Sequence, residues 1–305
     1  MMNMTSITRR THVQIGQLGG IALVNLATLT WATNMVLGRS MRDEVGPLTL
    51  AAARFLIASA LFAVVLQQRP PVERQLGRDR RHLLAMACSV VLFAPMLYLG
   101  LRHTPAVNAT LINGFGPLIT GILAALLIRE PMSKRQVTGA IIGLTGVIIL
   151  ISRGSLDAWD SVRGNVGDLI VLGAVSVWGL YSVLGRRVMR QRSALSATAF
   201  STFFGLPVLL LAAAWELQTF PVHVRPELIL AVLYIGVAPT VIGFLAWNSG
   251  VRRLGPSGAM VFYNTLPLYG AVLGLLFLGE TIGPTHILGG LLIIGGGLWA
   301  ARGRT

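Results

Sequence analysis

The sequence is poor in the residues that most enzymatic and metal sites require. Its single cysteine, Cys88, can form no internal disulfide, and no thiolate metal cluster can be built from it. The five histidines fall at chain ends or in expected loops, and neither a His-Glu-x-x-His zinc motif nor a phosphate-binding loop occurs. We therefore expect no cofactor, no metal site and no ATP-driven activity in this chain.

Charge is also scarce. Charged residues make up 12% of the chain, about half of their share in a typical soluble domain. Hydrophobic residues make up 54%, and the mean hydropathy is +0.71. The net charge of +14 is not accompanied by basic stretches with interleaved aromatic residues, so a nucleic-acid partner is not expected. This composition indicates a polytopic membrane protein with the lipid bilayer as its surroundings.

Ten apolar runs are long enough, or nearly so, to cross a bilayer. The segment 141–150 shows none of the polar–apolar alternation of a membrane barrel, so we predict an all-α integral membrane protein. The runs lie at 18–38, 47–66, 83–101, 108–128, 136–152, 166–184, 198–215, 228–247, 258–278 and 285–301.

The two halves of the chain repeat one another. The stretch from Trp31 to Arg39 reappears from Trp178 to Arg187, 147 residues later. Pro117 and Glu130 reappear as Pro267 and Glu280, 150 residues later. This self-similarity predicts a cytoplasmic segment 1–17 followed by two five-helix repeats, 18–152 and 166–301.

The distribution of lysine and arginine predicts the orientation. Alternate gaps between the runs hold 18 of these residues on the side of the N-terminus and 6 on the other. The positive-inside rule then places both termini in the cytoplasm, in the inner (plasma) membrane. Since each repeat has an odd number of spans, the second must be inverted relative to the first. Inverted repeats are typical of secondary transporters, whose substrate site lies between the repeats.

The ordered set of motifs resembles the EamA-type branch of the drug/metabolite transporter (DMT) superfamily. The set comprises the paired Trp-x-x-polar…Gly-Arg stretches, Pro117…Arg129-Glu130-Pro131 with Pro267…Gly279-Glu280-Thr281, and the glycine-rich last helix of each half. The resemblance implies ten helices around a central cavity and alternating-access transport of a small-molecule substrate, often export of amino acids, metabolites or drugs. It leaves the substrate unidentified.

Arg54 stands out because it is the formal charge that lies well inside an apolar run. An arginine near the centre of a membrane helix costs about 2.5–3.5 kcal/mol on insertion scales. It could bond backbone carbonyls or extend its charge towards the membrane surface. Alternatively it contacts the substrate or a gate, in which case a carboxylate would be its natural partner.

Two aromatic–polar pairs are predicted to line opposite walls of one cavity. Trp31 with Asn34, and Trp178 with Tyr181, each lie three residues apart on one helix face. The alternative is anchoring in the aromatic belts of the membrane interface. The remaining candidates for substrate binding are Tyr98, Asn113, Trp247, Tyr263 and Asn264, with Pro117 and Pro267 as hinges. Asn113 and Asn264 could instead join helices as structural hydrogen-bonding residues.

Several other features favour structural roles. Glu130 and Glu280 lie at helix boundaries, and Ser133 is predicted to open a capping box with Gln136. The glycines at 139, 143, 146, 289 and 296 predict close helix packing, either within the fold or in a homodimer.

Two alternative functions remain. One is a receptor-like or structural membrane protein. The other is an intramembrane serine protease, because Gly255-Pro-Ser-Gly258 matches Gly-x-Ser-Gly. That chemistry needs a helix-borne histidine beside Ser257, and the sequence offers none inside a span, so Ser257 is expected to cap a helix and the chain is not expected to be an enzyme.

Overall fold

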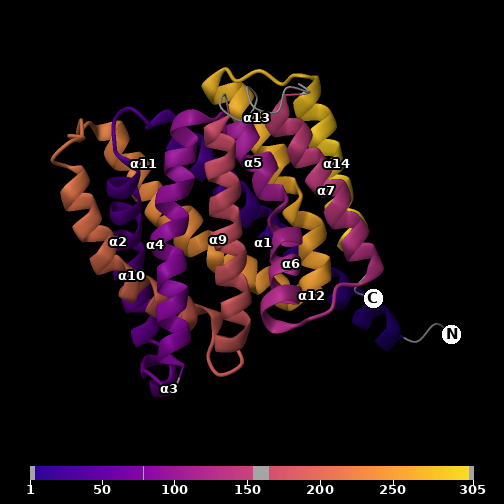
Figure 1. Ribbon diagram of the computed structural model, residues 1–305. Coiled ribbons are helices and arrows are strands. Elements are labelled where there is room, and N and C mark those ends of the chain that lie inside the picture. The colour runs from indigo at the N-terminus through magenta and orange to yellow at the C-terminus, as the bar shows by residue number, and fades with distance from the viewer. Residues whose placement is uncertain (1–3, 78, 154–164, 302–305) are drawn as a thin grey trace.

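The computed structural model describes residues 4–77, 79–153 and 165–301, which form helices and no strand (Figure 1). The first repeat comprises α1 (Met4–Ser40), α2 (Pro47–Gln67), α3 (Pro71–Arg74), α4 (Arg80–His103), α5 (Ala106–Gly114), α6 (Gly116–Ile128) and α7 (Lys134–Ser152). The second comprises α9 (Val166–Val188), α10 (Ala194–Glu216), α11 (Pro226–Val237), the π-helix η1 (Ala238–Ile242), α12 (Gly243–Tyr263), α13 (Thr265–Leu278) and α14 (Pro284–Ala301).

The helices are long and apolar enough to confirm the predicted all-α membrane fold. By length and composition, seven described spans could cross a bilayer, or eight if the bent pair α5 and α6 is one span. Two further apolar helices, α13 and α14, are shorter. The count of ten membrane spans stays a prediction.

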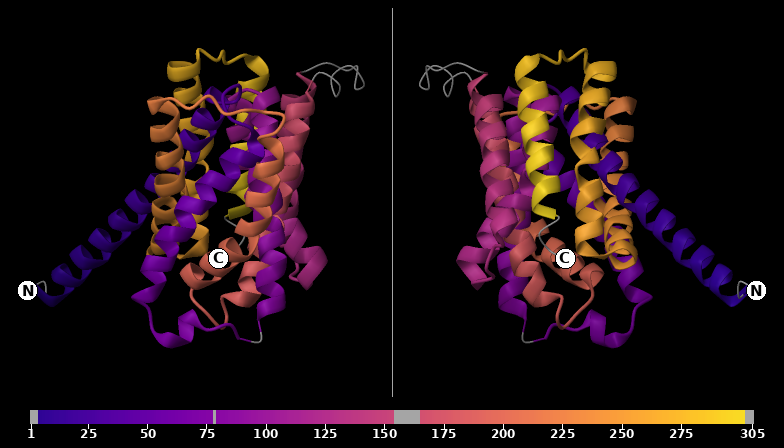
Figure 2. Two further views of the ribbon diagram at one scale, coloured as in Figure 1. Left: turned by 90° about the vertical axis from the view of Figure 1, so that its left-hand side faces the viewer. Right: turned by 90° about the vertical axis from the view of Figure 1, so that its right-hand side faces the viewer.

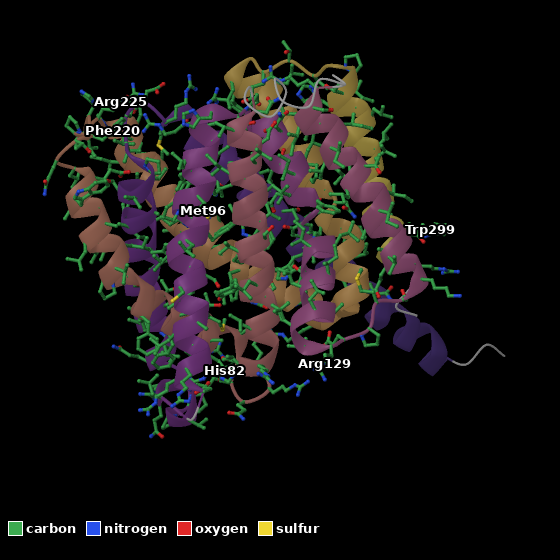
Figure 3. All side chains as sticks on the ribbon, viewed as in Figure 1. His82, Met96, Arg129, Phe220, Arg225 and Trp299 are labelled. Atoms are coloured by element: carbon green, nitrogen blue, oxygen red, sulfur yellow. The ribbon has the colours of Figure 1, made fainter. Side chains whose placement is uncertain are left out.

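The two halves run in opposite directions through the bundle. The C-terminal end of α1 lies beside the C-terminal end of α4, where Arg39 Nη1 donates to the carbonyls of Leu101 and Arg102, both at 2.8 Å. The N-terminal end of α9 lies at that same end, where Thr104 donates to Asp168. We call this the upper end, and the opposite end, which carries His82 and Arg129, the lower end (Figure 3).

Four pairs of helices hold the bundle together. Helix α1 packs along α12, and α4 packs along α9. Helix α2 packs along α10, and α7 along α14. Each pair joins one helix of the first half to one of the second. The halves therefore form one body, from which the first turns of α1 project at the lower end (Figure 2).

Glycines allow α7 and α14 to approach until their backbones touch. A Cβ atom at Gly139 would lie 2.4 Å from the carbonyl oxygen of Gly296, and one at Gly146 would lie 2.6 Å from that of Gly289. These distances are well inside van der Waals contact, so no other residue fits without separating the helices. The predicted close packing of the glycine faces is confirmed, and it lies within the fold.

Each half has a helix break just before the proline that the repeat places at the same position, Pro117 or Pro267. Phe115 separates α5 from α6, with a bend of 42°, and Asn264 separates α12 from α13. Pro117 and Pro267 follow these breaks by two and three residues. Because proline has no N–H and its ring clashes with the preceding turn, it interrupts the helix before it and is favoured in the first turn of the helix that follows. The breaks expected from Pro117 and Pro267 are present.

The expected boundary before the ninth apolar run is wrong. We predicted that a loop ends at Ser257 and that Ser257 caps the helix starting at 258. Helix α12 instead continues through these positions to Tyr263. The interruption falls at Asn264, where Pro267 prevents continuous helical hydrogen bonding.

Carboxylates hold two helix starts at the upper end. Glu280 accepts hydrogen bonds from the backbone N–H groups of Ala106 and Val107, at 2.7 and 2.9 Å, at the start of α5. Glu216 does the same for Leu48 and Thr49 at the start of α2, at 3.1 and 2.7 Å. Glu280 thus has a structural role, although it caps α5 and not α14, the helix that follows it in sequence.

A side-chain cap of the predicted kind opens α7. Ser133 Oγ accepts a hydrogen bond from the backbone N–H of Gln136, and the Gln136 side chain accepts one from the backbone N–H of Ser133. The predicted capping box is therefore confirmed.

Candidate binding cavity

Two neighbouring cavities, which share lining residues, lie between the halves of the bundle. The upper cavity has a volume of about 80 Å³ and the lower one about 310 Å³. The lower volume is at the small end of the range of about 300–1,000 Å³ found for small-molecule pockets. Both are lined by Trp31, Trp178, Tyr181, Thr198, Phe244 and Tyr263.

The lower cavity reaches towards the lower end of the molecule. Met189 and Ala194, which flank the turn between α9 and α10, are part of its lining, as is Val251 of α12. The upper cavity instead ends at Asn34 and Arg54, which lie within two turns of the upper ends of α1 and α2. A small molecule would therefore reach Arg54 from the lower end, past the aromatic residues shared by both cavities.

Arg54 is held by hydroxyl groups from two other helices. It is 7% exposed. Its Nε donates to Thr240 Oγ1 at 2.9 Å, and its Nη1 donates to the Tyr98 hydroxyl at 3.1 Å. The Tyr98 hydroxyl in turn donates to Asn34 Oδ1 at 2.8 Å. Arg54 therefore neither caps backbone carbonyls nor extends towards the membrane surface, the two structural roles considered from the sequence.

The π-helix explains the position and direction of the Thr240 hydroxyl. Pro239 has no N–H, so the carbonyl of Ile235, four residues earlier, loses its usual helical partner. The Thr240 hydroxyl donates to that carbonyl at 2.8 Å. Its oxygen is thereby left to accept from Arg54. Such single-turn π segments are frequent at functional sites.

The same irregularity attaches Trp31 to η1. The N–H of Gly243 bonds the carbonyl of Ala238, five residues back, so that it does not take the Pro239 carbonyl. Trp31 Nε1 donates to the Pro239 carbonyl at 3.0 Å. The indole ring is thus fixed by a polar contact while its faces remain available to the cavity.

Three aromatic rings form one wall of the cavity. The ring centroids of Trp31 and Trp247 are 5.6 Å apart, those of Trp31 and Tyr263 are 6.1 Å apart, and those of Trp247 and Tyr263 are 5.5 Å apart. The Tyr263 hydroxyl donates to Asn113 Oδ1 at 2.8 Å. This contact joins α12 to α5, directly before the break at Phe115.

A second aromatic group forms the opposite wall. Trp178 stacks on Tyr181 with centroids 5.1 Å apart and planes 15° apart, and Phe93 lies 5.1 Å from Trp178. The Tyr181 hydroxyl shares a hydrogen bond of 3.0 Å with Thr198. Both pairs predicted from the repeat therefore line one cavity.

Most of the predicted site residues lie at the cavity. Tyr98 stands behind the lining, where it joins Arg54 to Asn34. Asn264 is not part of the lining, because it lies against α14 at Gly297. The predicted residues that line one or both cavities are Trp31, Asn34, Arg54, Asn113, Pro117, Trp178, Tyr181, Trp247 and Tyr263.

Several residues that line the cavities were not predicted from the sequence. Thr240 had a usable signal, because it follows Pro239 inside an apolar run. Phe93 and the other hydroxyl-bearing residues, Ser89, Thr198 and Thr202, had no such signal, since apolar runs contain many residues of these types. The missed lining residues of the upper cavity include Ser89, Phe93, Thr198, Thr202, Pro239, Thr240 and Phe244.

The charge of the lining is one-sided. Arg54 is the charged residue among the described residues that line either cavity, and no carboxylate accompanies it there. Across the described ranges, no cluster of histidine, cysteine or carboxylate groups could hold a metal ion. The cavity can therefore offer aromatic surface, hydroxyl and amide groups, and one positive charge.

Comparison with known proteins gives the same answer over nearly the whole chain. The model of the EamA-like transporter family matches residues 18–152 and 165–301. The uncharacterized transporter YyaM of Bacillus subtilis is 28% identical, over 92% of both chains. A probable terminal-alkyne amino-acid exporter of Streptantibioticus cattleyicolor is 27% identical, over 89% of both chains.

Two further similarities agree with these. A probable amino-acid metabolite efflux pump of Salmonella typhimurium is 24% identical, over 90% of this chain and 92% of that protein. A protein of known crystal structure, 26% identical, superposes with a TM-score of 0.62 over 94% of this chain and 96% of its own.

Proposed function

The chain belongs to the EamA-like transporter family, and from this premise we propose that it exports small amphipathic metabolites, such as amino acids or drug-like compounds, across the inner membrane. Transport proceeds by alternating access around the central cavity. The observation that carries the proposal is a cavity between the two halves that is lined from both and extends to one end of the bundle.

The distribution of basic residues supports export as the direction. The gaps between helices at the lower end hold the arginines and lysines that the positive-inside rule assigns to the cytoplasm, among them Arg69, Arg129 and Lys134 (Figure 3). The wider cavity lies on that side. In this arrangement the substrate is loaded from the cytoplasm, as the names of the exporter and efflux-pump relatives also suggest.

The upper side of the cavity supports the second half of the cycle. The contacts of Arg54 join α2, α4 and η1 above the aromatic walls, and Tyr98 adds α1 through Asn34. Release to the outside requires these contacts to separate while the lower end closes. The breaks at Phe115 and Asn264 provide hinges for that exchange.

The test is flux through the purified protein in liposomes, with a panel of labelled amino acids, amines, sugars and nucleosides. We expect saturable counterflow of one chemical class. If no class is transported and none stabilises the purified protein against heat, the receptor-like or structural role replaces this proposal.

A variant connects the flux to the cavity. Trp178→Ala removes one face of the aromatic wall, so we expect a Km for the transported substrate raised about tenfold, the loss of roughly 1.4 kcal/mol of binding. Trp215→Ala is the matched control, because Trp215 is 65% exposed and lies outside both linings. An unchanged Km in Trp178→Ala would remove Trp178 from the substrate site.

A further inference from the structure

We propose that Arg54 is an anion-binding subsite at the upper end of the cavity, which takes the carboxylate of a substrate whose apolar part lies on the aromatic walls. This inference rests on the proposed transport function and narrows its substrate class to carboxylates with an apolar or aromatic tail.

The charge of Arg54 has no counter-ion among the residues that the structure describes. The guanidinium is buried, yet both of its hydrogen-bond acceptors, Thr240 and Tyr98, are neutral hydroxyls. No ion pair within the described ranges includes Arg54. A buried charge is costly unless it is paired. An anionic ligand in the cavity would supply the missing partner.

The Arg54 guanidinium keeps N–H donors that Thr240 and Tyr98 do not use and that such a ligand could accept from. An arginine side chain has five N–H donors, and those from Arg54 to Thr240 and Tyr98 use two. Arg54 lines the upper cavity. A carboxylate can accept two parallel hydrogen bonds from a guanidinium, which is both stronger and more directional than a single bond.

Two hydrogen bonds hold the Arg54 guanidinium in place before any ligand binds. The Tyr98 hydroxyl gives its proton to Asn34, and the Thr240 hydroxyl gives its proton to the Ile235 carbonyl. Each hydroxyl oxygen can therefore act only as an acceptor towards Arg54. Tyr98 and Thr240 are positioning residues in this sense. A preorganised donor binds its partner without an ordering cost at the moment of binding.

The lining next to Arg54 suits the apolar part of the proposed ligand. Below Arg54 the lining is dominated by the rings of Trp31, Trp178, Tyr181 and Tyr263. These rings suit a flat apolar or aromatic tail. Aromatic rings also attract cations, but the described lining holds no carboxylate and one positive charge. A simple amine is therefore disfavoured at this position.

The test compares an acid with its isosteric amide on the purified protein, using 3-phenylpropionate and 3-phenylpropanamide. Binding is followed by quenching of tryptophan fluorescence, because Trp31 and Trp178 line the cavity. We expect the acid to bind at least tenfold more tightly. Equal affinities in the wild-type protein overturn the proposal without any variant.

Variants then assign the preference to Arg54. Arg54→Gln should weaken acid binding at least tenfold and leave amide binding unchanged. The matched control is Arg102→Gln, which removes an arginine from the same end of the bundle but outside both cavities. If Arg54→Gln does not fold, Tyr98→Phe keeps the charge and removes one positioning hydroxyl. Acid binding should then fall severalfold with amide binding unchanged, and an equal change for both ligands would contradict the proposal.

The flux assay separates this inference from the function on which it rests. Transport of a neutral compound, without preference for the acid, overturns the anion subsite and leaves the transporter in place. Selective binding of the acid, without flux of any compound, supports the subsite and contradicts the transport proposal.

Discussion

Two neighbouring glycines in α14 should respond oppositely to the same substitution. Gly296 faces α7, where an added Cβ would lie 2.5 Å from the Gly139 carbonyl oxygen and 2.8 Å from the Gly143 backbone nitrogen. Gly295 is exposed, and an added Cβ would have no neighbour within 4 Å among the described atoms. The pair therefore separates the steric demand of the helix crossing from the intrinsic effect of alanine in a helix.

The magnitudes follow from these distances. Alanine favours a helix over glycine by about 1 kcal/mol, which both variants gain. Gly296→Ala also overpacks a contact between two backbones, which cannot be relieved by a side-chain rotation. Overpacking typically costs about 1–3 kcal/mol, and we expect the upper part of that range here. The difference between the two variants should thus be about 2–3 kcal/mol, with Gly295→Ala the more stable.

The assay is thermal unfolding of each purified variant in one detergent, followed by tryptophan fluorescence. A difference of about 2–3 kcal/mol corresponds to roughly 4–12 °C in Tm for a chain of this size class. Equal Tm values would refute the reasoning, because they would mean that α7 and α14 can separate at no cost. A Tm of Gly295→Ala below that of Gly296→Ala would mean that the face of α14 that carries Gly295 is packed against a neighbour.

Three further predictions compare the stability of single variants, and the last of them also compares ligand binding. Gly279 has φ +63° at the end of α13, and Arg129 occupies the matching position of α6 with φ 54°. Left-handed backbone costs a residue with a Cβ roughly 1 kcal/mol. Gly279→Ala should therefore lower the free energy of unfolding by about that amount, and Arg129→Gly should raise it. Glu216→Ala should cost about 2–3 kcal/mol because it removes a charged acceptor from two partly buried N–H groups, whereas Glu227→Ala, at an exposed helix start, should cost under about 1 kcal/mol. Thr240→Val should leave the Tm within a few degrees but weaken 3-phenylpropionate binding severalfold, and unchanged binding would remove Thr240 from the positioning of Arg54.

The sequence was sufficient to predict features that depend on local patterns. The ten apolar runs predicted an all-helical membrane protein, and Ser133 predicted its capping box because both partners lie within four residues. The repeat predicted that Trp31 and Trp178 would share a cavity, because inversion brings equivalent helix faces together. Pro117 predicted its helix break for a reason that is local as well.

Features that depend on contacts distant in sequence were not predictable in this way. Glu216 accepts from the backbone N–H of Leu48 in the first turn of α2, 168 residues earlier, and no pattern around it distinguishes it from other carboxylates at helix ends. Asn264 was assigned to the cavity by helical spacing from its neighbours. The break at that residue changes the spacing, so Asn264 lies against α14 instead. The Thr240–Arg54 contact spans 186 residues and depends on the π-helix.

The repeat extends to the helix pairs, the proline breaks and the aromatic walls of the cavity but not to Arg54, and this difference has a functional consequence. Paired helices and proline breaks recur in both halves, as alternating access requires if each half is to open and close in turn. Arg54 has no such counterpart, because the residue 147 positions later is Ser201, whose hydroxyl donates to the Thr198 carbonyl of its own helix at 2.9 Å. In the proposed cycle the carboxylate is therefore held at the upper end alone. A carboxylate substrate that enters from the lower end would therefore pass between the aromatic walls with its charged group first. At the upper end it would meet the hydrogen bonds of Arg54, which must separate for its release.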